Sequence, residues 1–390
     1  MTRLLVVSSY FDTHRGGLEI VAGELARRLA ERFSVSWLAS DAVAPDALRE
    51  VDLLPVRAWN ITERRFGIPF PLPVPTALVR LFKAVKSADA VMLHDALYPL
   101  SIATAAAAKL CGKPLLVLQH IGAVPYRDPL PRLMMAIANR VVARPILAMA
   151  EQVVFISYVV RDYFADVGFE APPQVIFNGV DTKVFHPGDR TAARDRFDLE
   201  AEAKIALFVG RFVEKKGLHV LEAAARARPD LNFAFAGWGP VDPAAWGLPN
   251  VKVFPGLSGR RLADLYRAAN VLVLPSQGEG FPLVVQEALA CDLPVVCGAE
   301  TVRADPAAAG CLVGVEVAGD PSEAAAGVVA AIDEVLAAAD EPAPQRQVLV
   351  RERYGWSAAA DRYAGLLERV IRERDAVNRG ANRAALGRAS

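Results

Sequence analysis

The sequence predicts an α/β protein with two Rossmann-like domains, each built on a doubly wound parallel sheet. Short apolar runs of strand length alternate with helical segments along most of the chain, which is the pattern of βα units. The series of runs starts again near residue 204, so that the chain holds more strands than one doubly wound sheet needs. A stretch rich in turn formers, residues 179–190, separates the two series. The length of 390 residues agrees, because it corresponds to two or three domains.

The first series begins with residues 4–9, a nearly continuous apolar run typical of a parallel strand that is covered on both faces. A polar, glycine-bearing loop, DTHRGG, follows it, and residues 18–33 then show helical periodicity. Further strands are expected at 34–39, 90–93, 114–119 and 152–156. The second series is expected at 204–209, 232–236, 251–254, 271–274 and 294–297, again with helical segments between the strands.

These series predict an N-terminal domain over residues 1–182 and a C-terminal domain over residues 183–372. We also expect part of the C-terminal helix to pack back on the N-terminal domain. Residues 373–390 have little apolar periodicity and predict a flexible tail.

Composition excludes several classes of protein. The 44 basic and 44 acidic residues cancel, so the chain lacks the overall positive field of a nucleic-acid-binding protein. The four cysteines are scattered, and they match neither a disulfide framework nor the close pairs of a zinc site. The apolar run at the N-terminus is too short for a signal peptide, and no window of about 18 apolar residues could span a membrane. We therefore expect a cytoplasmic protein.

The segment 271–296, VLVLPSQGEGFPLVVQEALACDLPVV, carries the strongest functional signal. It predicts a buried strand, a flexible turn and a helix, with Pro282 suited to the first helical position. The free N–H groups of such a helix N-terminus suit a phosphorylated or polyhydroxylated ligand. Glu279 lies on the turn, and Glu287 lies on an apolar face of the helix, where a buried carboxylate needs a partner or a ligand. The alternative is that both are ordinary glutamates that face solvent.

A second signal lies in residues 204–227, where a predicted strand stops at Gly210. Arg211 emerges at the carboxyl end of that strand, and Lys216 and Gly217 follow on a short loop that opens a helix. Ligands of open α/β sheets bind outside the carboxyl ends of the strands. A guanidinium beside an ammonium suits a diphosphate there, whereas the alternative is a pair of ordinary surface charges.

Taken together, these segments resemble the retaining GT-B glycosyltransferases of the family-4 type. Glu279 and Glu287 stand in that family's frame of a glutamate, seven residues and a second glutamate. The resemblance runs from about residue 5 to about residue 300, with several motifs in the family's order. The further matching positions are Gly16, Gly17, Glu19, His120, residues 178–181, Phe185, Pro187, Gly210, Arg211, Lys216, Gly217, residues 237–240, residues 262–276, Gly280, Phe281, Ala288 and Pro294.

The resemblance implies a GT-B fold whose domains face a cleft, with the acceptor on the N-terminal domain and the nucleotide sugar on the C-terminal domain. Glu287 would accept hydrogen bonds from the ribose, and Glu279 would bind hydroxyls of the transferred sugar. Arg211 and Lys216 would neutralise the leaving diphosphate, as a metal does in other glycosyltransferases. Backbone N–H groups would assist Glu279 from the segment made of Gly280, Phe281, Pro282 and Leu283.

The resemblance implies roles for the remaining positions too. Gly16 and Gly17 would let the first loop approach donor phosphate and acceptor closely, since glycine has no Cβ. His120 would lie near the donor sugar, with a purely structural histidine as the alternative, and the loop that contains Gly256 would hold the nucleobase. We expect a UDP- or GDP-linked sugar as co-substrate, no resident cofactor and no metal. Ile121 departs from the pattern, because an aspartate often follows the histidine in this family.

We therefore predict a metal-independent, retaining glycosyltransferase that acts on a cell-envelope polysaccharide or a lipid-linked glycan precursor. One alternative is a nucleotide-sugar epimerase of GT-B fold, and another is a sugar-binding relative that has lost turnover. A Rossmann dehydrogenase is disfavoured, because the first loop reads THRGGLE and lacks G-x-G-x-x-G.

The segment from Arg57 to Lys86 stands apart in charge. Six cations face one anion there, Glu63, and large aromatic residues lie among them. One interpretation is a contact with anionic lipid on the inner face of the cell membrane, and the other is a solvated loop followed by an ordinary amphipathic helix.

Overall fold

The computed structural model describes residues 1–14, 16–43, 48, 50–61, 70–123, 129–338 and 344–386. The chain forms two compact units. The N-terminal unit comprises Met1–Ile156, Val160–Ile176 and Trp356–Ser390, and the C-terminal unit comprises Ser157–Val159 and Phe177–Gly355. The sequence-based division at residues 182 and 372 differs from these limits, since the last helix is assigned to the N-terminal unit.

The N-terminal unit is built on a seven-stranded parallel sheet of order β3-β2-β1-β6-β7-β8-β9. Its strands are β1 (Arg3–Tyr10), β2 (Ser34–Ser40), β3 (Val51–Val56), β6 (Ala90–His94), β7 (Leu115–Gln119), β8 (Gln152–Phe155) and β9 (Gln174–Val175). Its helices are α1 (Gly17–Leu29), α3 (Pro75–Ser87), α4 (Pro99–Cys111), α5 (Pro129–Ala138), a π-helix (Asn139–Ala143), α6 (Arg144–Met149) and α15 (Trp356–Leu386), while α7 (Tyr158–Tyr163) includes residues of both units. A small antiparallel pair, β4 (Ala58–Trp59) and β5 (Leu72–Pro73), lies outside the main sheet.

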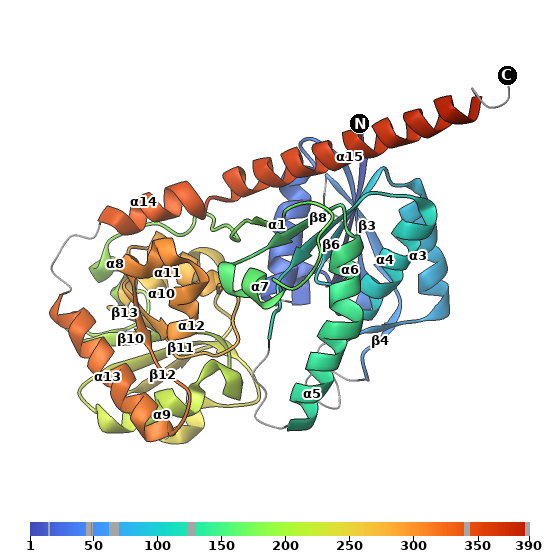
Figure 1. Ribbon diagram of the computed structural model, residues 1–390. Helices are drawn as coiled ribbons and strands as arrows, with labels where there is room; N and C mark the ends of the chain where they lie inside the picture. The colour runs from blue at the N-terminus through green and yellow to red at the C-terminus, as the bar shows by residue number, and fades with distance from the viewer. Residues whose placement is uncertain are drawn as a thin grey trace. The chain divides into compact units, whose positions relative to one another are not determined.

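Helix α15 is part of the N-terminal unit although it ends the chain (Figure 1). Leu367 on this helix is fully buried. Arg32 pairs with Glu368 at 2.7 Å, and Arg362 donates to the carbonyl oxygen of Val175 at 2.9 Å. The helix runs to Leu386 and so includes most of the segment for which the sequence predicts a flexible tail.

The C-terminal unit is built on a six-stranded parallel sheet of order β12-β11-β10-β13-β14-β15. Its strands are β10 (Ile205–Arg211), β11 (Asn232–Trp238), β12 (Val251–Phe254), β13 (Val271–Leu274), β14 (Val295–Gly298) and β15 (Leu312–Val315). Its helices are α8 (Arg190–Asp195), α9 (Leu218–Ala227), α10 (Gly259–Ala268), α11 (Leu283–Ala290), α12 (Ala299–Ala304), α13 (Pro321–Ala337) and α14 (Pro344–Arg353).

Both sheets are doubly wound, which confirms the predicted fold class. In each sheet the first strand of the unit lies centrally, and the strand order reverses beside it. The reversal occurs between β1 and β6 in one unit and between β10 and β13 in the other. The carboxyl ends of strands at such a switch point leave an opening where ligands bind. The loops that follow β10 and β13 therefore hold the candidate residues of the C-terminal unit.

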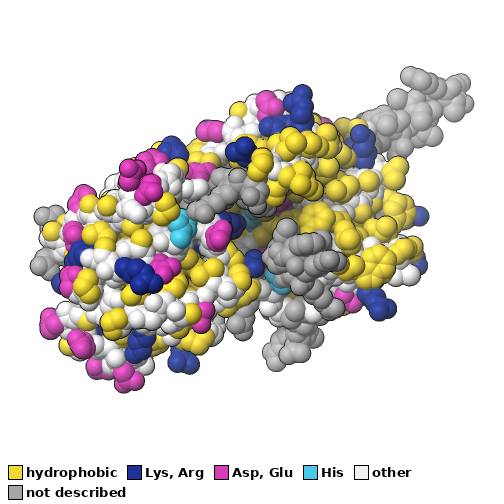
Figure 2. All heavy atoms as spheres, turned by 90° about the horizontal axis from the view of Figure 1, so that it is seen from below, with side chains coloured by type: hydrophobic (Ala, Val, Ile, Leu, Met, Phe, Trp, Pro, Cys, Tyr) yellow, Lys and Arg dark blue, Asp and Glu magenta, His cyan; other side chains and the backbone are white. Residues whose placement is uncertain are grey.

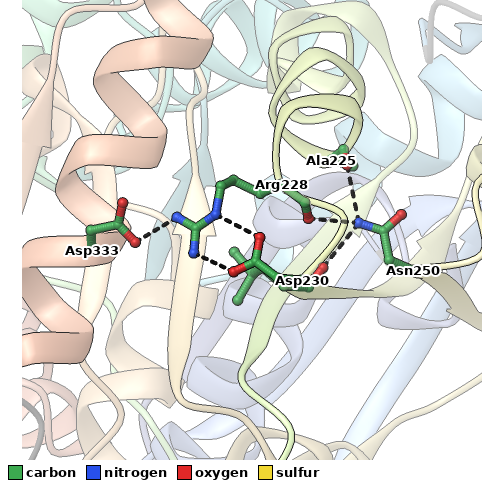
Figure 3. A network of polar contacts seen from close by, with 6 residues as sticks. Ala225, Arg228, Asp230, Asn250 and Asp333 are labelled. Carbon is green, nitrogen blue, oxygen red and sulfur yellow. Dashed lines mark hydrogen bonds and ion pairs between the residues drawn. The ribbon is translucent and has the colours of Figure 1, made fainter.

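A buried amide fixes the turn that ends α9 in the C-terminal unit (Figure 3). The Asn250 side chain donates to the carbonyl oxygens of Ala225, Arg228 and Leu231 at 3.0, 2.9 and 3.0 Å. Beside it, the half-buried Arg228 guanidinium pairs with the exposed carboxylates of Asp230 and of Asp333 on α13. Carbonyls at the end of a helix lack partners within the helix, and Asn250 supplies them.

We predict that Asn250→Ala lowers the free energy of unfolding of the C-terminal unit by about 1–3 kcal/mol, because it leaves buried carbonyls without a donor. Asp230→Ala is the matched control, since it removes an exposed ion pair that is worth less than about 1 kcal/mol. Urea unfolding followed by tryptophan fluorescence measures both. Equal effects of the two substitutions would contradict the role given to Asn250.

Candidate functional site

In the C-terminal unit the loops that follow β10 and β13 are held tightly together. Gly217 ends the first loop with a φ of +76°, and a Cβ at this position would lie 2.1 Å from the carbonyl oxygen of Pro275. The backbone N–H of Gln277 donates to the carbonyl oxygen of Lys215 at 3.2 Å. Only glycine fits this close approach, so the two loops lie in direct contact because residue 217 is a glycine.

This contact brings Lys216 and Glu279 together. The Lys216 ammonium lies 2.9 Å from the Glu279 carboxylate, and each side chain is only 15% exposed. Burial by itself would raise the pKa of Glu279, but attraction from Lys216 and Lys215 and the hydrogen bond from Lys216 hold that pKa below its ordinary value. Glu279 is therefore ionised at neutral pH.

Arg211 lies close to this ion pair, at the end of β10. Its guanidinium lies over the indole ring of Trp238 at 5.0 Å, and its buried Nε has no hydrogen-bond partner among the residues that the structure describes. Lys215 interacts electrostatically with Glu279, Lys216 and Arg211, and so links Arg211 to the ion pair. Three cations against one carboxylate leave the cluster with an excess of positive charge, which favours a multiply charged anion.

The turn before α11 is anchored at both of its sides. The N–H of Gly278 donates to the Glu300 carboxylate at 2.8 Å, and the Gln277 amide donates to the carbonyl oxygen of Val317 at 2.8 Å. Helix α11 begins at Leu283, and Pro282 is the residue just before it. The sequence predicts Pro282 at the first helical position, so the helix begins one residue later than expected. The Val285 N–H donates to the carbonyl oxygen of Pro282 at 3.1 Å, which leaves the N–H groups of Leu283 and Val284 to a ligand.

Phe281 is placed differently from the other residues of this turn. Its side chain is 2% exposed and packs against the rings of Phe177 and Tyr354. Its side chain is thus part of the core, and only its backbone can serve a ligand.

Glu287 of α11 accepts a hydrogen bond of 2.7 Å from the hydroxyl of Tyr266 on α10. Burial raises the pKa of Glu287 to about 7, although the Tyr266 bond lowers it. Burial and the nearby Glu287 raise the pKa of Tyr266 well above its ordinary value, so this hydroxyl stays protonated as a donor. Gly256 is remote from β13 within the sheet: it follows β12, the edge strand, in a turn where a Cβ would meet no atom within 4 Å.

In the N-terminal unit His120 follows β7 and pairs with His94, the last residue of β6. Nδ1 of His94 lies 3.3 Å from Nε2 of His120, and both rings are buried. Burial lowers the pKa of His94 to about 3 and, together with His94, lowers that of His120 well below its ordinary value. Both rings are neutral at pH 7, so one donates an N–H and the other accepts it.

Asp95 supplies a buried carboxylate beside His120. It has a φ of +64°, and its side chain accepts hydrogen bonds from the backbone of Leu97 and Ile121 and from the Gln119 amide, at 3.1, 3.0 and 3.2 Å. Burial raises the pKa of Asp95 to about 6, although these hydrogen bonds lower it. The family's aspartate is absent at position 121, but the carboxylate of Asp95 reaches the same stretch of backbone from the neighbouring strand.

Gly16 and Gly17 begin helix α1. A Cβ at Gly16 would lie 2.0 Å from the carboxylate of the buried Glu19, whereas a Cβ at Gly17 would meet nothing within 4 Å. Gly16 therefore makes room for Glu19, and Gly17 is open to a ligand. Residue 15 of this loop lies outside the described residues.

No group of three potential metal ligands among His, Cys, Asp and Glu lies together within the described ranges. No helix in the described part of the chain is long and apolar enough to cross a membrane.

Two family models match consecutive parts of the chain. One, described as "Glycosyltransferase Family 4", matches residues 15–184, and the other, "Glycosyl transferases group 1", matches residues 189–343. "D-inositol 3-phosphate glycosyltransferase 2" of Catenulispora acidiphila is 30% identical over 403 aligned positions, which cover 92% of this chain and 91% of that relative. The chain is a group 1 glycosyltransferase.

Other relatives of this glycosyltransferase agree. "D-inositol 3-phosphate glycosyltransferase" of Mycolicibacterium vanbaalenii is 34% identical over 233 residues, which cover 53% of this chain and half of that relative. Among solved structures, sucrose-phosphate synthase of Thermosynechococcus elongatus matches 96% of this chain and 100% of its own, with a TM-score of 0.73 and 20% identity. Anabaena HepE in complex with UDP-glucose matches 94% and 100%, with a TM-score of 0.71 and 17% identity. These structural likenesses show that the glycosyltransferase has the GT-B fold.

Sequence reasoning missed several residues that support the candidate site of the glycosyltransferase. Trp238 lies in the GWGP motif, and Lys215 lies beside the predicted Lys216, so both had a signal in the sequence. Tyr266 also had a signal, since it lies in the matching segment 262–276. Glu300 and Asp95 had none, because their partners lie 22 and 26 residues away along the chain.

We predict that His94→Gln changes the pH dependence of stability. Because its pKa in the folded state is lowered to about 3 from an ordinary value of 6.5, neutral His94 stabilises the fold above about pH 6.5, and this contribution is lost as the pH falls toward 3. Asp95, with a pKa raised to about 6, stabilises the fold at low pH and loses that contribution as the pH rises through 6.

We expect the thermal denaturation midpoint of His94→Gln to differ from that of the wild type by more at about pH 7.5 than at about pH 5. His186→Gln, which replaces an exposed histidine, is the control and should show no such narrowing. A difference between the two midpoints that does not change with pH would contradict the lowered pKa that we assign to the buried His94.

Proposed function

We propose that this glycosyltransferase moves a hexose or related sugar from a UDP- or GDP-linked donor to an acceptor hydroxyl, with retention at the anomeric carbon. The cluster of Arg211, Lys215, Lys216 and Glu279 at the switch point of the C-terminal sheet carries the proposal. It combines excess positive charge for a diphosphate with a carboxylate for sugar hydroxyls. The UDP-glucose that HepE holds in its structure supports a nucleotide sugar as the donor.

Arg211 and Lys216 bind the diphosphate in this proposal. The Nε of Arg211 is buried and free of partners among the described residues, and the guanidinium lies over the Trp238 ring, which restrains it by a cation–π contact. A guanidinium held in this way gives oriented N–H donors to phosphate oxygens without a search through rotamers. Negative charge grows on the diphosphate as the bond to the sugar breaks, and these cations stabilise that charge.

Glu279 and Glu287 bind hydroxyls in this proposal. Glu279, ionised and anchored by Lys216, accepts hydrogen bonds from the transferred sugar, with backbone N–H groups of Gly280, Phe281 and Leu283 beside it. Glu287 accepts hydrogen bonds from the ribose, and Tyr266 orients its carboxylate. Gly256 lies in the turn after β12 that we assign to the nucleobase.

Retention follows in this proposal from a front-face displacement. The bond between the anomeric carbon and the diphosphate oxygen breaks, and the acceptor oxygen forms its bond on the same face. The acceptor proton passes to the leaving phosphate oxygen. Such a step needs positioning and electrostatic stabilisation. The nucleophile of a retaining hydrolase is not required, and the Glu279 carboxylate, already paired with Lys216, is poorly suited to that role.

On the N-terminal unit we assign Gly17, Gly16 and His120 to the neighbourhood of the reacting groups. The neutral ring of His120, held by His94, would donate or accept one hydrogen bond with the donor sugar. We propose a cell-envelope polysaccharide or lipid-linked glycan precursor as the acceptor. The names of the relatives favour a second candidate acceptor, a phosphorylated cyclitol, and a screen of both acceptor classes separates the two candidates.

We also propose that the protein works in the cytoplasm and contacts the inner face of the membrane through the segment from Arg57 to Lys86. In the described part of this segment Trp59, Val79 and Phe82 are large exposed apolar side chains, and Lys83 and Lys86 are exposed as well. Glu63, Arg64, Arg65 and Phe66 lie outside the described residues.

We predict that Glu287→Gln weakens donor binding and removes its pH dependence. A carboxylate with a pKa of about 7 is charged above that pH and protonated below it, so wild-type donor affinity should rise between about pH 6 and pH 8. Loss of a charge-assisted hydrogen bond worth about 1.5–3 kcal/mol lowers affinity at pH 8 by about tenfold to a hundredfold. Isothermal titration with UDP and GDP at both pH values measures this. A variant with unchanged affinity at pH 8 would exclude the ribose role.

We predict that Arg211→Gln and Lys216→Gln lower kcat more than they raise KM for the donor, because the diphosphate is most negative in the transition state. A hundredfold loss of kcat, on the order of 3 kcal/mol, is expected for either variant. Arg226→Gln, at an exposed position of α9, is the control and should change neither parameter.

The same turnover assays, run with and without EDTA, test whether the reaction needs a metal, and their products distinguish a transferase from an epimerase and from a sugar-binding relative. Wild-type turnover should persist in the chelator, and inhibition that magnesium reverses would contradict a metal-independent reaction. Release of an epimerised free sugar without acceptor would identify an epimerase, and donor binding without hydrolysis or transfer would identify a sugar-binding relative.

A further inference from the structure

A cavity of about 360 Å³ lies on the C-terminal unit, between the end of α8, helix α10 and the segment 183–186. Helices α8 and α10 pack side by side next to it (Figure 1). Its volume lies within the range of cavities that hold small molecules. The polar side chains that line it come from all three parts of its wall: Lys183, His186, Arg196, Arg260, Asp264 and Arg267.

The charge of the cavity is strongly positive. Four cations, Lys183, Arg196, Arg260 and Arg267, stand against one carboxylate, that of Asp264. By contrast, acidic and basic side chains are interspersed on the face of the C-terminal unit that the left part of Figure 2 shows. Charges of one sign around a cavity concentrate ions of the opposite sign, so the cavity favours a multiply charged anion.

Half of this charged set is fixed by contacts within the protein. The Asp264 carboxylate, only 16% exposed, lies 2.7 Å from the Arg267 guanidinium and 3.1 Å from that of Arg196. Arg267 also donates to the carbonyl oxygens of Val184 and His186, at 2.8 and 2.9 Å. These contacts hold α10 against the chain segment that precedes α8, so the wall of the cavity is built without a ligand.

Lys183 and Arg260 make up the other half of the set. Both are exposed, and neither forms an ion pair within the described part of the chain. Unpaired cations that share a cavity with two further cations repel them, and a bound anion removes this repulsion. The forked N–H groups of a guanidinium match the oxygens of a phosphate, and an ammonium adds a point charge.

This cavity is separate from the candidate donor site. None of its lining residues belongs to the loops after β10 and β13. Its residues on α10, Arg260, Asp264 and Arg267, recur at intervals of four and three and therefore share one face of the helix. Tyr266, which binds Glu287 of the donor site, is about 100° around the helix from Arg267.

We propose that this cavity binds a second ligand, a small molecule that carries a phosphate or diphosphate group. Lys183 and Arg260 bind the phosphate oxygens, and Arg196 and Arg267 add to the positive field. None of the large apolar side chains that are exposed in the described structure lines the cavity, so it offers no contact to the acyl chain of a lipid. The proposal does not depend on the transfer reaction proposed above.

The experiment is isothermal titration with inorganic pyrophosphate in metal-free buffer. Pyrophosphate should bind at the donor cluster as well, so the tests use a parent variant, Arg211→Gln, Lys216→Gln, in which that cluster is neutralised. Adding Lys183→Gln and Arg260→Gln to the parent tests the cavity.

The matched control adds Arg303→Gln and Arg351→Gln to the parent. These two arginines are exposed on α12 and α14 of the same unit and do not line the cavity. The control therefore changes the net charge by the same amount as the cavity substitutions. Circular dichroism checks that all variants are folded.

We expect the wild type to bind two pyrophosphate ions and the parent to bind one. The cavity substitutions should weaken the remaining binding by at least about tenfold, because they remove charge-assisted hydrogen bonds. The matched control should bind as the parent does.

Asp264→Asn in the parent should strengthen pyrophosphate binding by about fivefold, because it removes the single negative charge of the cavity at nearly constant shape. A merely structural role of Asp264 would give the opposite result, since a loosened wall would bind the anion more weakly. The direction of the change therefore separates an anion site from a set of structural ion pairs.

Four outcomes would overturn the proposal. They are a parent that does not bind pyrophosphate, cavity substitutions that leave its affinity unchanged, a matched control that loses as much affinity as the cavity variant, and weaker binding by Asp264→Asn. The proposed transfer reaction is tested separately, by the turnover of the parent with a nucleotide sugar.

Discussion

The candidate donor site depends on the close approach of two loops at the switch point of the C-terminal sheet. Gly217 meets the carbonyl of Pro275 at a distance that no side chain permits, and this contact sets Lys216 beside Glu279. The ion pair in turn keeps Glu279 ionised in a largely buried position, where desolvation alone would favour its protonated form. Arg211 completes the cluster from the end of β10, and Trp238 holds its guanidinium. One backbone contact thus determines both the charge and the geometry of the cluster.

In the N-terminal unit a side chain joins two strand ends. Asp95 adopts a left-handed conformation at the end of β6, and its carboxylate binds the backbone that follows β7. The two strand ends are therefore joined through a side chain, and His94 and His120 meet beside them. A non-glycine residue at positive φ costs free energy, and such strain persists where surrounding contacts impose it. Here three hydrogen bonds to the Asp95 carboxylate supply those contacts.

Much of the fold could be predicted from the sequence, because buried parallel strands are short apolar runs between helical segments. All ten strands expected from such runs exist, whereas three strands of the two main sheets, β3, β9 and β15, were not predicted. β3 contains Asp52 and Pro55, β9 has only two residues, and β15 is a four-residue run that contains Gly314. The motifs predicted Arg211, Lys216, Glu279 and Glu287, but not the contacts that orient them. Those contacts come from distant residues such as Tyr266 and Glu300, whose proximity arises only from the three-dimensional fold.

The position of α15 at the C-terminal end of the sequence has a consequence for folding during synthesis. The C-terminal unit is made of residues 157–159 and 177–355, whereas the N-terminal unit needs the helix that begins at Trp356. On the ribosome, the second unit is therefore synthesised completely before the first unit has its last helix. Domains usually fold in the order of their synthesis, whereas here the unit that begins first is the last to be completely synthesised. A stop codon just after Gly355 would leave the C-terminal unit whole and would expose the buried surface of the N-terminal unit that α15 covers.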